Sequence, residues 1–161
     1  MFPNRRSIRL PGFDYRRPGA YFVTIGTWRM KPTLGQVTAA GFDANESGRI
    51  VAAAWREIPA HFPTVKLDAW CVMPNHLHGI LWLEPADGSP KLCPPLGLVV
   101  GLFKSSSARR INHLIGIPGA PVWHRNYYER IIRTRDALDP VRRYIDLNPE
   151  KWWEDRLRPR L

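Results

Sequence analysis

Two runs of strand-forming residues stand almost end to end in the middle of the chain. Residues 65–73 (VKLDAWCVM) and 76–83 (HLHGILWL) are rich in β-branched, aromatic and aliphatic side chains, a composition that favours extended backbone. The Pro74-Asn75 pair that separates them is typical of a tight turn. The sequence therefore predicts a β-hairpin, which requires a fold with antiparallel strands.

Periodic segments on either side of the hairpin predict the remaining elements. Strand composition marks residues 20–28 and 122–132, and helical spacing of apolar residues marks 45–58 and 96–115. A last helix is predicted to open at residues 134–136 and to end at Pro149. The order β-α-β-β-α-β-α is that of an α+β, ferredoxin-like split βαβ fold, with helices on one face of an antiparallel sheet and an added C-terminal helix.

The chain of 161 residues is expected to form one domain. We divide it into a basic N-terminal arm over 1–19, a core over 20–152 and a tail over 153–161. Lys and Arg number 24 against 14 Asp and Glu, a net charge of +10. This excess favours a polyanionic partner, with nucleic acid first, although a basic surface that serves only solubility is the alternative.

Cysteine content and hydropathy indicate the compartment. Cys71 and Cys93 lack the CxxC spacing of a zinc knuckle, so a reducing compartment is the simpler setting. No run approaches the roughly 20 apolar residues that a bilayer-spanning helix needs. We therefore expect a cytoplasmic protein without a membrane partner.

His76 and His78 lie two residues apart on the second strand of the hairpin. Strand side chains alternate between faces, so both imidazoles project to one side while Leu77 turns into the core. Two imidazoles held in this way form half of a metal site. The alternative is that they are ordinary polar residues satisfied by hydrogen bonds.

Tyr144 and Asn148 are separated by one helical turn, so they can face the same way. The carbonyl oxygen of Asn148 suits Mg²⁺ or Mn²⁺, and a cation shared with the histidines would place the Tyr144 phenol beside it. This arrangement predicts phosphodiester cleavage through a covalent tyrosine. The alternatives are that Asn148 caps a helix and that Tyr144 packs its ring on the sheet.

Three sequence blocks together resemble one protein family. MPNHLHGIL, WHRNYYERIIR and RRYIDLNPEKW, in this order, are similar to blocks of the single-tyrosine HUH transposases, and among these to the REP-associated tyrosine transposases. The resemblance covers roughly residues 20–152. It implies that His76, His78 and Asn148 bind a divalent metal, Mg²⁺ or Mn²⁺, and that Tyr144 is the catalytic tyrosine. Tyr127 and Tyr128 become positioning or DNA-stacking residues and second candidates for the nucleophile.

The family resemblance further implies cleavage and rejoining of single-stranded DNA beside a hairpin or palindrome, through a 5′-phosphotyrosine, by a monomer or homodimer. A domesticated, non-cleaving hairpin-binding protein and a replication or conjugation relaxase are the alternatives. The basic side chains expected to contact phosphates are Arg5, Arg6, Arg9, Arg16, Arg17, Lys104, Arg109, Arg110, Arg142 and Arg143. Trp152 and Trp153 could stack unpaired bases or pack the tail onto the sheet.

Overall fold

The computed structural model describes residues 10–85, 87 and 93–157, with no side chains described for 155–157. Its centre is a four-stranded antiparallel sheet in the order β4-β5-β1-β6. The strands are β1 (Gly19–Gly26), β4 (Val65–Met73), β5 (His76–Leu83) and β6 (Tyr128–Ile132). Relative to their order in the chain, this is the strand order of the ferredoxin-like fold, so the predicted fold class is confirmed.

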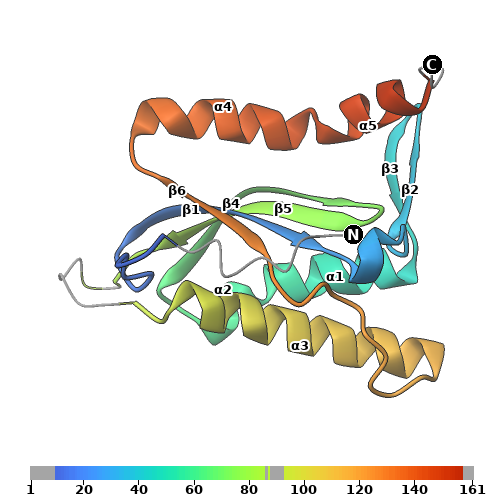
Figure 1. The fold of residues 1–161 in the computed structure, drawn as a ribbon, viewed down its shortest axis with the longest axis horizontal. Coiled ribbons are helices and arrows are strands. Elements are labelled where there is room, and N and C mark those ends of the chain that lie inside the picture. The colour runs from blue at the N-terminus through green and yellow to red at the C-terminus, as the bar shows by residue number, and fades with distance from the viewer. Residues whose placement is uncertain (1–9, 86, 88–92, 158–161) are drawn as a thin grey trace.

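Helices cover both faces of the sheet (Figure 1). One face carries α1 (Glu46–Arg56), the short α2 (Ile58–His61) and α3 (Leu96–Ile115). The opposite face carries α4 (Arg135–Asp146), which is followed directly by α5 (Asn148–Leu157). The added C-terminal helix of the prediction is therefore the layer that faces the histidine side of the sheet.

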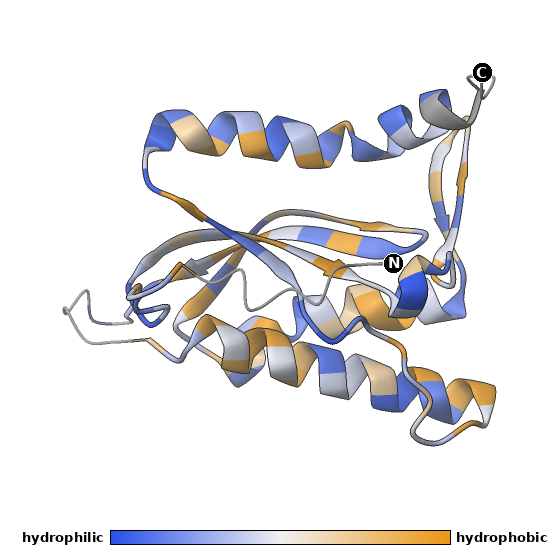
Figure 2. Cartoon of the chain, in the orientation of Figure 1, coloured by the Kyte–Doolittle hydropathy of each residue, from blue (hydrophilic) through white to orange (hydrophobic). Residues whose placement is uncertain are grey.

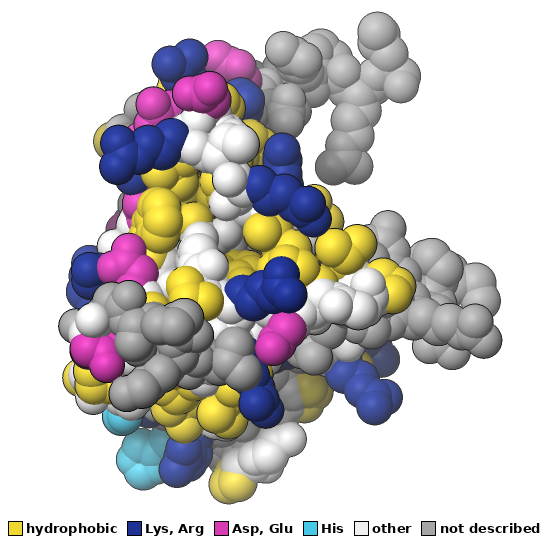
Figure 3. Space-filling view, turned by 90° about the vertical axis from the view of Figure 1, so that its left-hand side faces the viewer, with side chains coloured by type: hydrophobic (Ala, Val, Ile, Leu, Met, Phe, Trp, Pro, Cys, Tyr) yellow, Lys and Arg dark blue, Asp and Glu magenta, His cyan; other side chains and the backbone are white. Residues whose placement is uncertain are grey.

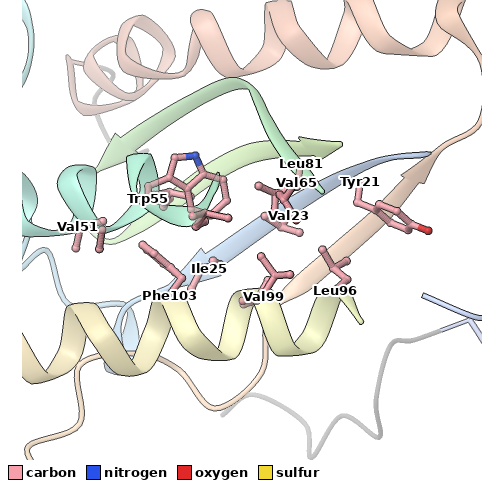
Figure 4. Close-up of a cluster of buried hydrophobic side chains, with 14 of the residues drawn as sticks. Tyr21, Val23, Ile25, Val51, Trp55, Val65, Leu81, Leu96, Val99 and Phe103 are labelled. Carbon is pink, nitrogen blue, oxygen red and sulfur yellow. The ribbon is translucent and has the colours of Figure 1, made fainter. Parts of the chain in front are cut away.

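The main hydrophobic core fills the space between the sheet, α1 and α3 (Figure 4). Its centre is Trp55, whose side chain is fully buried and packs edge-on against Phe103. Trp55 also lies so close to β5 that a Cβ on Gly79 would stand 2.4 Å from its ring. Because no larger residue fits there, Gly79 lets the core reach the strand segment that carries His78.

A smaller core fixes α4 on the other face. Its buried members from α4 are Leu138, Val141 and Ile145, which pack against Phe22 and Ile80 of the sheet. The spacing of three and four residues gives α4 one apolar side, and Figure 2 shows hydrophobic and hydrophilic residues interleaved along the helix. Burial of this stripe holds the helix over the sheet.

A second hairpin, β2 (Gly35–Thr38) with β3 (Gly41–Ala44), was not predicted. Each strand has only four residues, too few to establish a period-2 pattern. The hairpin forms a separate two-stranded sheet that contacts α5 (Figure 1). It therefore supports the end of the C-terminal layer.

The predicted strand over 122–132 is wrong in its first half, because only Tyr128–Ile132 pairs with β1. The upstream segment uses its polar groups elsewhere. Trp123 forms a single bridge with Thr27, and its indole N–H donates to Ser107 Oγ at 2.9 Å. Strand composition alone cannot show that a segment bonds to a helix instead of a strand.

The first strand and the last helix also differ from their predicted limits. β1 stops at Gly26, and Trp28–Met30 form a 3-10 turn instead of strand. Pro149 does not end the helical region, because it is the second residue of α5, where its missing N–H costs no helical hydrogen bond. Tyr144 and Asn148 thus lie on either side of a nearly continuous junction at Leu147.

Candidate active site

The two histidines of β5 lie side by side on the face that α4 and α5 cover. His76 and His78 have their ring centroids 4.4 Å apart, and both are buried. Leu77 points to the opposite face, where its side chain is fully buried in the main core. The alternation of a strand therefore produces the paired imidazoles.

Hydrogen bonding fixes the orientation of His78. Thr24 is its cross-strand partner on β1, and Thr24 Oγ1 lies 2.8 Å from His78 Nδ1. Phe22 stacks on the same imidazole with ring centroids 5.4 Å apart. With Nδ1 hydrogen-bonded to Thr24, Nε2 is the ring nitrogen that remains for a ligand.

Asn75 sets the tautomer of His76. Its Oδ1 lies 2.6 Å from His76 Nδ1, while its Nδ2 donates to the carbonyl of Met30 at 3.3 Å. The amide oxygen therefore faces the ring, so Nδ1 carries the proton and Nε2 keeps its lone pair. His76 Nε2 is buried and has no hydrogen-bond partner among the described residues.

The segment after β1 secures Asn75 in turn. Thr27 donates its backbone N–H to the Asn75 carbonyl at 2.9 Å, and its Oγ1 shares one proton between that carbonyl, at 3.0 Å, and the Lys31 carbonyl, at 2.7 Å. Arg29 and Met30 follow with φ values of 55° and 54°, in the left-handed region that side chains disfavour. Two such residues in succession place backbone strain beside the histidine strand.

The helical layer supplies three more side chains to the same place. Tyr144, Asn148 and Trp152 recur at intervals of four residues, so they lie along one side of the α4–α5 junction. The Tyr144 ring centroid lies 5.4 Å from that of His78, and the Trp152 ring lies 6.0 Å from His76. Asn148 is buried, whereas Tyr144 remains 43% exposed. Trp152 is thus a site residue, and it lies against His76.

Burial keeps both imidazoles uncharged. It lowers the pKa of His76 to about 4, an effect that the nearby Asn148 side chain partly offsets. It lowers the pKa of His78 to about 3, with a further contribution from His76. Neutral imidazole is the form that binds metal ions.

The donor atoms around His76 Nε2 fit a divalent cation. Two neutral imidazoles and the Asn148 amide would supply nitrogen and oxygen ligands, and the unpaired Nε2 is an atom that a ligand would satisfy. The described residues contain no cluster of three or more His, Cys, Asp and Glu side chains. A metal here would therefore depend on the amide as the third ligand.

The predicted phosphate contacts are scattered over the molecule. Arg5, Arg6 and Arg9 lie outside the described residues, and Arg16, Arg17, Arg109 and Arg143 are exposed. Lys104, Arg109 and Arg110 belong to α3, which covers the face of the sheet opposite the histidines. Several of the predicted contacts have partners within the protein: Lys104 bonds to the carbonyls of His124 and Arg125, Arg110 pairs with Glu57, Arg142 pairs with Asp68 and Asp139, and Arg17 lies over the Phe13 ring. Their contact with DNA stays a prediction.

Sequence reasoning missed three residues that shape the site: Thr24, Phe22 and the positioning role of Asn75. Asn75 could have been suspected, because it directly precedes His76. Thr24 and Phe22 could not, because their place beside His78 depends on the register between β1 and β5.

Among the described residues, none of the helices has the length and hydropathy that a membrane span requires.

Comparison with known proteins yields relatives of both sequence and fold. An uncharacterized protein of Haemophilus influenzae is 34% identical over 172 residues, covering 96% of this chain and 93% of that protein. A REP-associated tyrosine transposase bound to a REP hairpin superposes with a TM-score of 0.61 at 21% identity, covering 85% of this chain and 70% of that one. A candidate transposase from Deinococcus radiodurans R1 gives a TM-score of 0.54 at 20% identity, covering 86% and 96%. No protein-family model matches the sequence.

Proposed function

This chain belongs to one family with the Haemophilus influenzae protein and has the fold of a REP-associated tyrosine transposase, and from that premise we propose that it is a transposase. In this proposal it cleaves and rejoins single-stranded DNA beside hairpins, with a divalent metal and a tyrosine nucleophile. The observation that carries the proposal is the contact of the Tyr144 ring with His78, 5.4 Å between centroids.

His76, His78 and Asn148 would hold the cation, Mg²⁺ or Mn²⁺. When bound, such an ion supplies Lewis acidity that polarises a phosphate oxygen and stabilises the charge that develops on it. The chain's own contribution is to keep two imidazoles neutral, buried and fixed in orientation by Thr24 and Asn75. Ligands held by such partners lose little freedom on binding the ion.

Tyr144 would act as the nucleophile. Its hydroxyl gives up a proton, its oxygen forms a bond to phosphorus, and the bond from phosphorus to the 3′ oxygen breaks. The 3′ oxygen leaves and becomes a free hydroxyl by taking up a proton. Lys151 Nζ lies 5.5 Å from the centre of the Tyr144 ring, which is within the range of a cation–π contact. The reverse reaction rejoins strands without ATP.

The half-exposed position of Tyr144 suits this role. A tyrosine that only packed on the sheet would bury its ring, as Tyr21 does at 1% exposure, whereas Tyr144 remains 43% exposed. Its neighbour Asn148 is buried beside His76. One residue faces the substrate and the other faces the imidazoles.

Covalent attachment is the direct test. Single-stranded palindromes from the protein's own genomic neighbourhood, labelled at the 3′ end, should yield a labelled protein adduct in Mn²⁺ and none in chelator. Tyr144→Phe should reduce the adduct at least a thousandfold, because phenylalanine has no nucleophilic oxygen, with the wild-type affinity for the oligonucleotide retained. Tyr128→Phe is the matched control and should still form the adduct.

An adduct that persists in Tyr144→Phe would overturn the assignment of the nucleophile. Tight binding of the palindromes without any adduct in Mn²⁺, and without sensitivity to chelator, would instead favour a hairpin-binding protein that no longer cleaves.

A further inference from the structure

A cleft of about 640 Å³ opens beside the proposed catalytic residues. Its floor is formed by side chains of β1 and β6, and its roof by α4. His78 and Tyr144 line one part of it. A group that entered the cleft would therefore lie beside the side chains of His78 and Tyr144.

Strand pairing determines which side chains form the floor. Phe22 is the cross-strand partner of Arg130, and Thr24 is the partner of Tyr128, so all four project toward α4. Glu129, between the two β6 residues, projects to the other face of the sheet. Consequently none of the described residues that line the cleft is acidic.

The aromatic side chains of the cleft differ in accessibility. Phe22 is 7% exposed and forms an apolar back wall, with the rings of Tyr128 and Tyr144 edge-on to it at 6.4 and 6.2 Å. Tyr128 is 44% exposed, on a strand at the edge of the sheet. Tyr128 therefore presents a free ring face, which is a platform on which a planar group can stack.

The end of the site at His76 is closed. Trp152 lies against His76, and α5 is in contact with the β2–β3 hairpin. The other end, where β6 passes into α4, carries Arg130, Arg133 and Arg135 against one acidic residue, Asp136, all exposed. Figure 3 views this end of the molecule and shows Lys and Arg side chains, with Asp and Glu side chains among them, around exposed hydrophobic ones. A polyanionic strand is thus favoured at the open end.

We propose that this cleft binds the unpaired nucleobase next to the scissile phosphate, with Tyr128 as its stacking platform and Arg130 as a contact to the adjoining backbone phosphate. The inference rests on the proposed function, since it assumes that single-stranded DNA is the substrate. Stacking on an aromatic ring accepts any base, whereas the enclosed apolar wall of Phe22 requires that the base be unpaired. The volume is within the range that accommodates a ligand of nucleoside size.

Binding without chemistry tests the platform. The probe is a fluorescein-labelled oligothymidylate of twelve nucleotides, measured by anisotropy in EDTA, so that no cleavage intervenes. Tyr128→Ala should raise the Kd about tenfold, the typical effect of removing one stacked base, and Tyr128→Phe should stay within about twofold of wild type. Leu114→Ala is the control, because Leu114 has similar exposure but belongs to α3 on the opposite face.

Salt dependence tests Arg130. In the plot of log Kd against log salt concentration, Arg130→Ala should reduce the slope by about 0.7, the amount expected for one lost phosphate contact to a single strand. Arg130→Lys should preserve the slope because it keeps the charge. An unchanged slope in Arg130→Ala would refute the phosphate contact.

The adduct assay tests which nucleotide stacks on Tyr128. Once the wild-type protein has revealed its cleavage point, an abasic site is placed at each flanking position in turn. Loss of the neighbouring base should slow adduct formation about tenfold in the wild type and have no further effect in Tyr128→Ala. If the abasic site and Tyr128→Ala slowed adduct formation additively, the stacking of that base on Tyr128 would be refuted.

The two proposals fail in different ways. If Tyr128→Ala binds the oligothymidylate as the wild type does while Tyr144 still forms its adduct, the stacking cleft is refuted and the transposase proposal stands. If Tyr128→Ala weakens binding but the wild type forms no adduct with any palindrome, the cleft is supported as a single-strand site and the cleavage proposal is refuted.

Discussion

At the scale of single residues, the site depends on hydrogen bonds that orient two rings. His76 and His78 could each present either nitrogen to a ligand, and the choice is made by Asn75 and Thr24. Asn75 is in turn held by Thr27 and by the carbonyl of Met30. A polar side chain next to each histidine therefore decides how the proposed ligands point.

This dependence predicts a loss of metal affinity when Asn75 is changed. Asn75→Ala should weaken Mn²⁺ binding about 10- to 100-fold, because His76 loses the acceptor that fixes its tautomer and ring orientation. Binding can be measured by titration calorimetry or from the EPR signal of free Mn²⁺, without any DNA. Asn75→Asp keeps an acceptor oxygen and should retain most of the affinity. Equal weakening in both variants would contradict a positioning role.

At the scale of elements, the packing of α4 on the sheet sets the distance between Tyr144 and His78. In addition to the contacts of its apolar side, the helix forms an ion pair with the sheet, in which Arg142 Nη2 lies 2.7 Å from Asp68 Oδ2. Asp68 belongs to β4, at the irregularity in its pairing with β5, and also accepts from Trp82 Nε1 at 2.8 Å. One carboxylate thus joins β4, β5 and α4.

This clamp predicts a pH-dependent stability. The hydrogen bond from Arg142, followed by those from Trp82 and the Ala69 backbone, holds the pKa of Asp68 well below its ordinary value. A carboxylate with a depressed folded pKa stabilises the fold above its unfolded pKa of about 4, and the contribution is lost as pH falls through the folded pKa. Asp68→Asn should therefore lower the free energy of unfolding at pH 6 by about 1 kcal/mol, since solvent screens the arginine.

Urea denaturation from pH 3 to pH 7 checks this expectation. The difference between wild type and Asp68→Asn should be constant above about pH 5 and shrink below pH 4. Glu84→Gln is a suitable control, because its ion pair with Lys66 is exposed on both sides. A gap that widened on acidification would contradict the assignment of the effect to Asp68.

At the scale of the whole molecule, the chain assembles the proposed site from its own parts. The α4 helix packs on the sheet of the same chain, and it brings Tyr144 to His78 without a second copy. The β2–β3 hairpin adds support at α5. The structure therefore predicts that the tyrosine acts in cis, on the histidines of its own chain.

A complementation experiment measures this arrangement. His78→Ala lacks a proposed ligand and Tyr144→Phe lacks the proposed nucleophile, so each alone should form at most about a thousandth of the wild-type adduct. Mixing the two should not restore it, because in cis neither chain holds a complete site. Recovery of a quarter or more of the wild-type adduct would show that the tyrosine acts on the histidines of another chain.

The sequence by itself determined three features: the hairpin, the projection of His76 and His78 from one face of the sheet, and the placement of Tyr144 and Asn148 on one side of the helical region. These features depend on local periodicity, which residue type and spacing encode directly. It also predicted a fold class that the structure confirms. Local pattern placed Pro149 wrongly, as a helix end, because the next turn is stabilised by packing of α5 and not by propensity.

Only the tertiary structure decided which distant residues meet. The register of β1 against β5 and β6 places Thr24 at His78 and Phe22 opposite Arg130, and a shift by one residue would turn all of them to the other face. The height of α4 over the sheet leaves the cleft beside Tyr128. The strand register joins residues more than 50 positions apart, and no local period carries it.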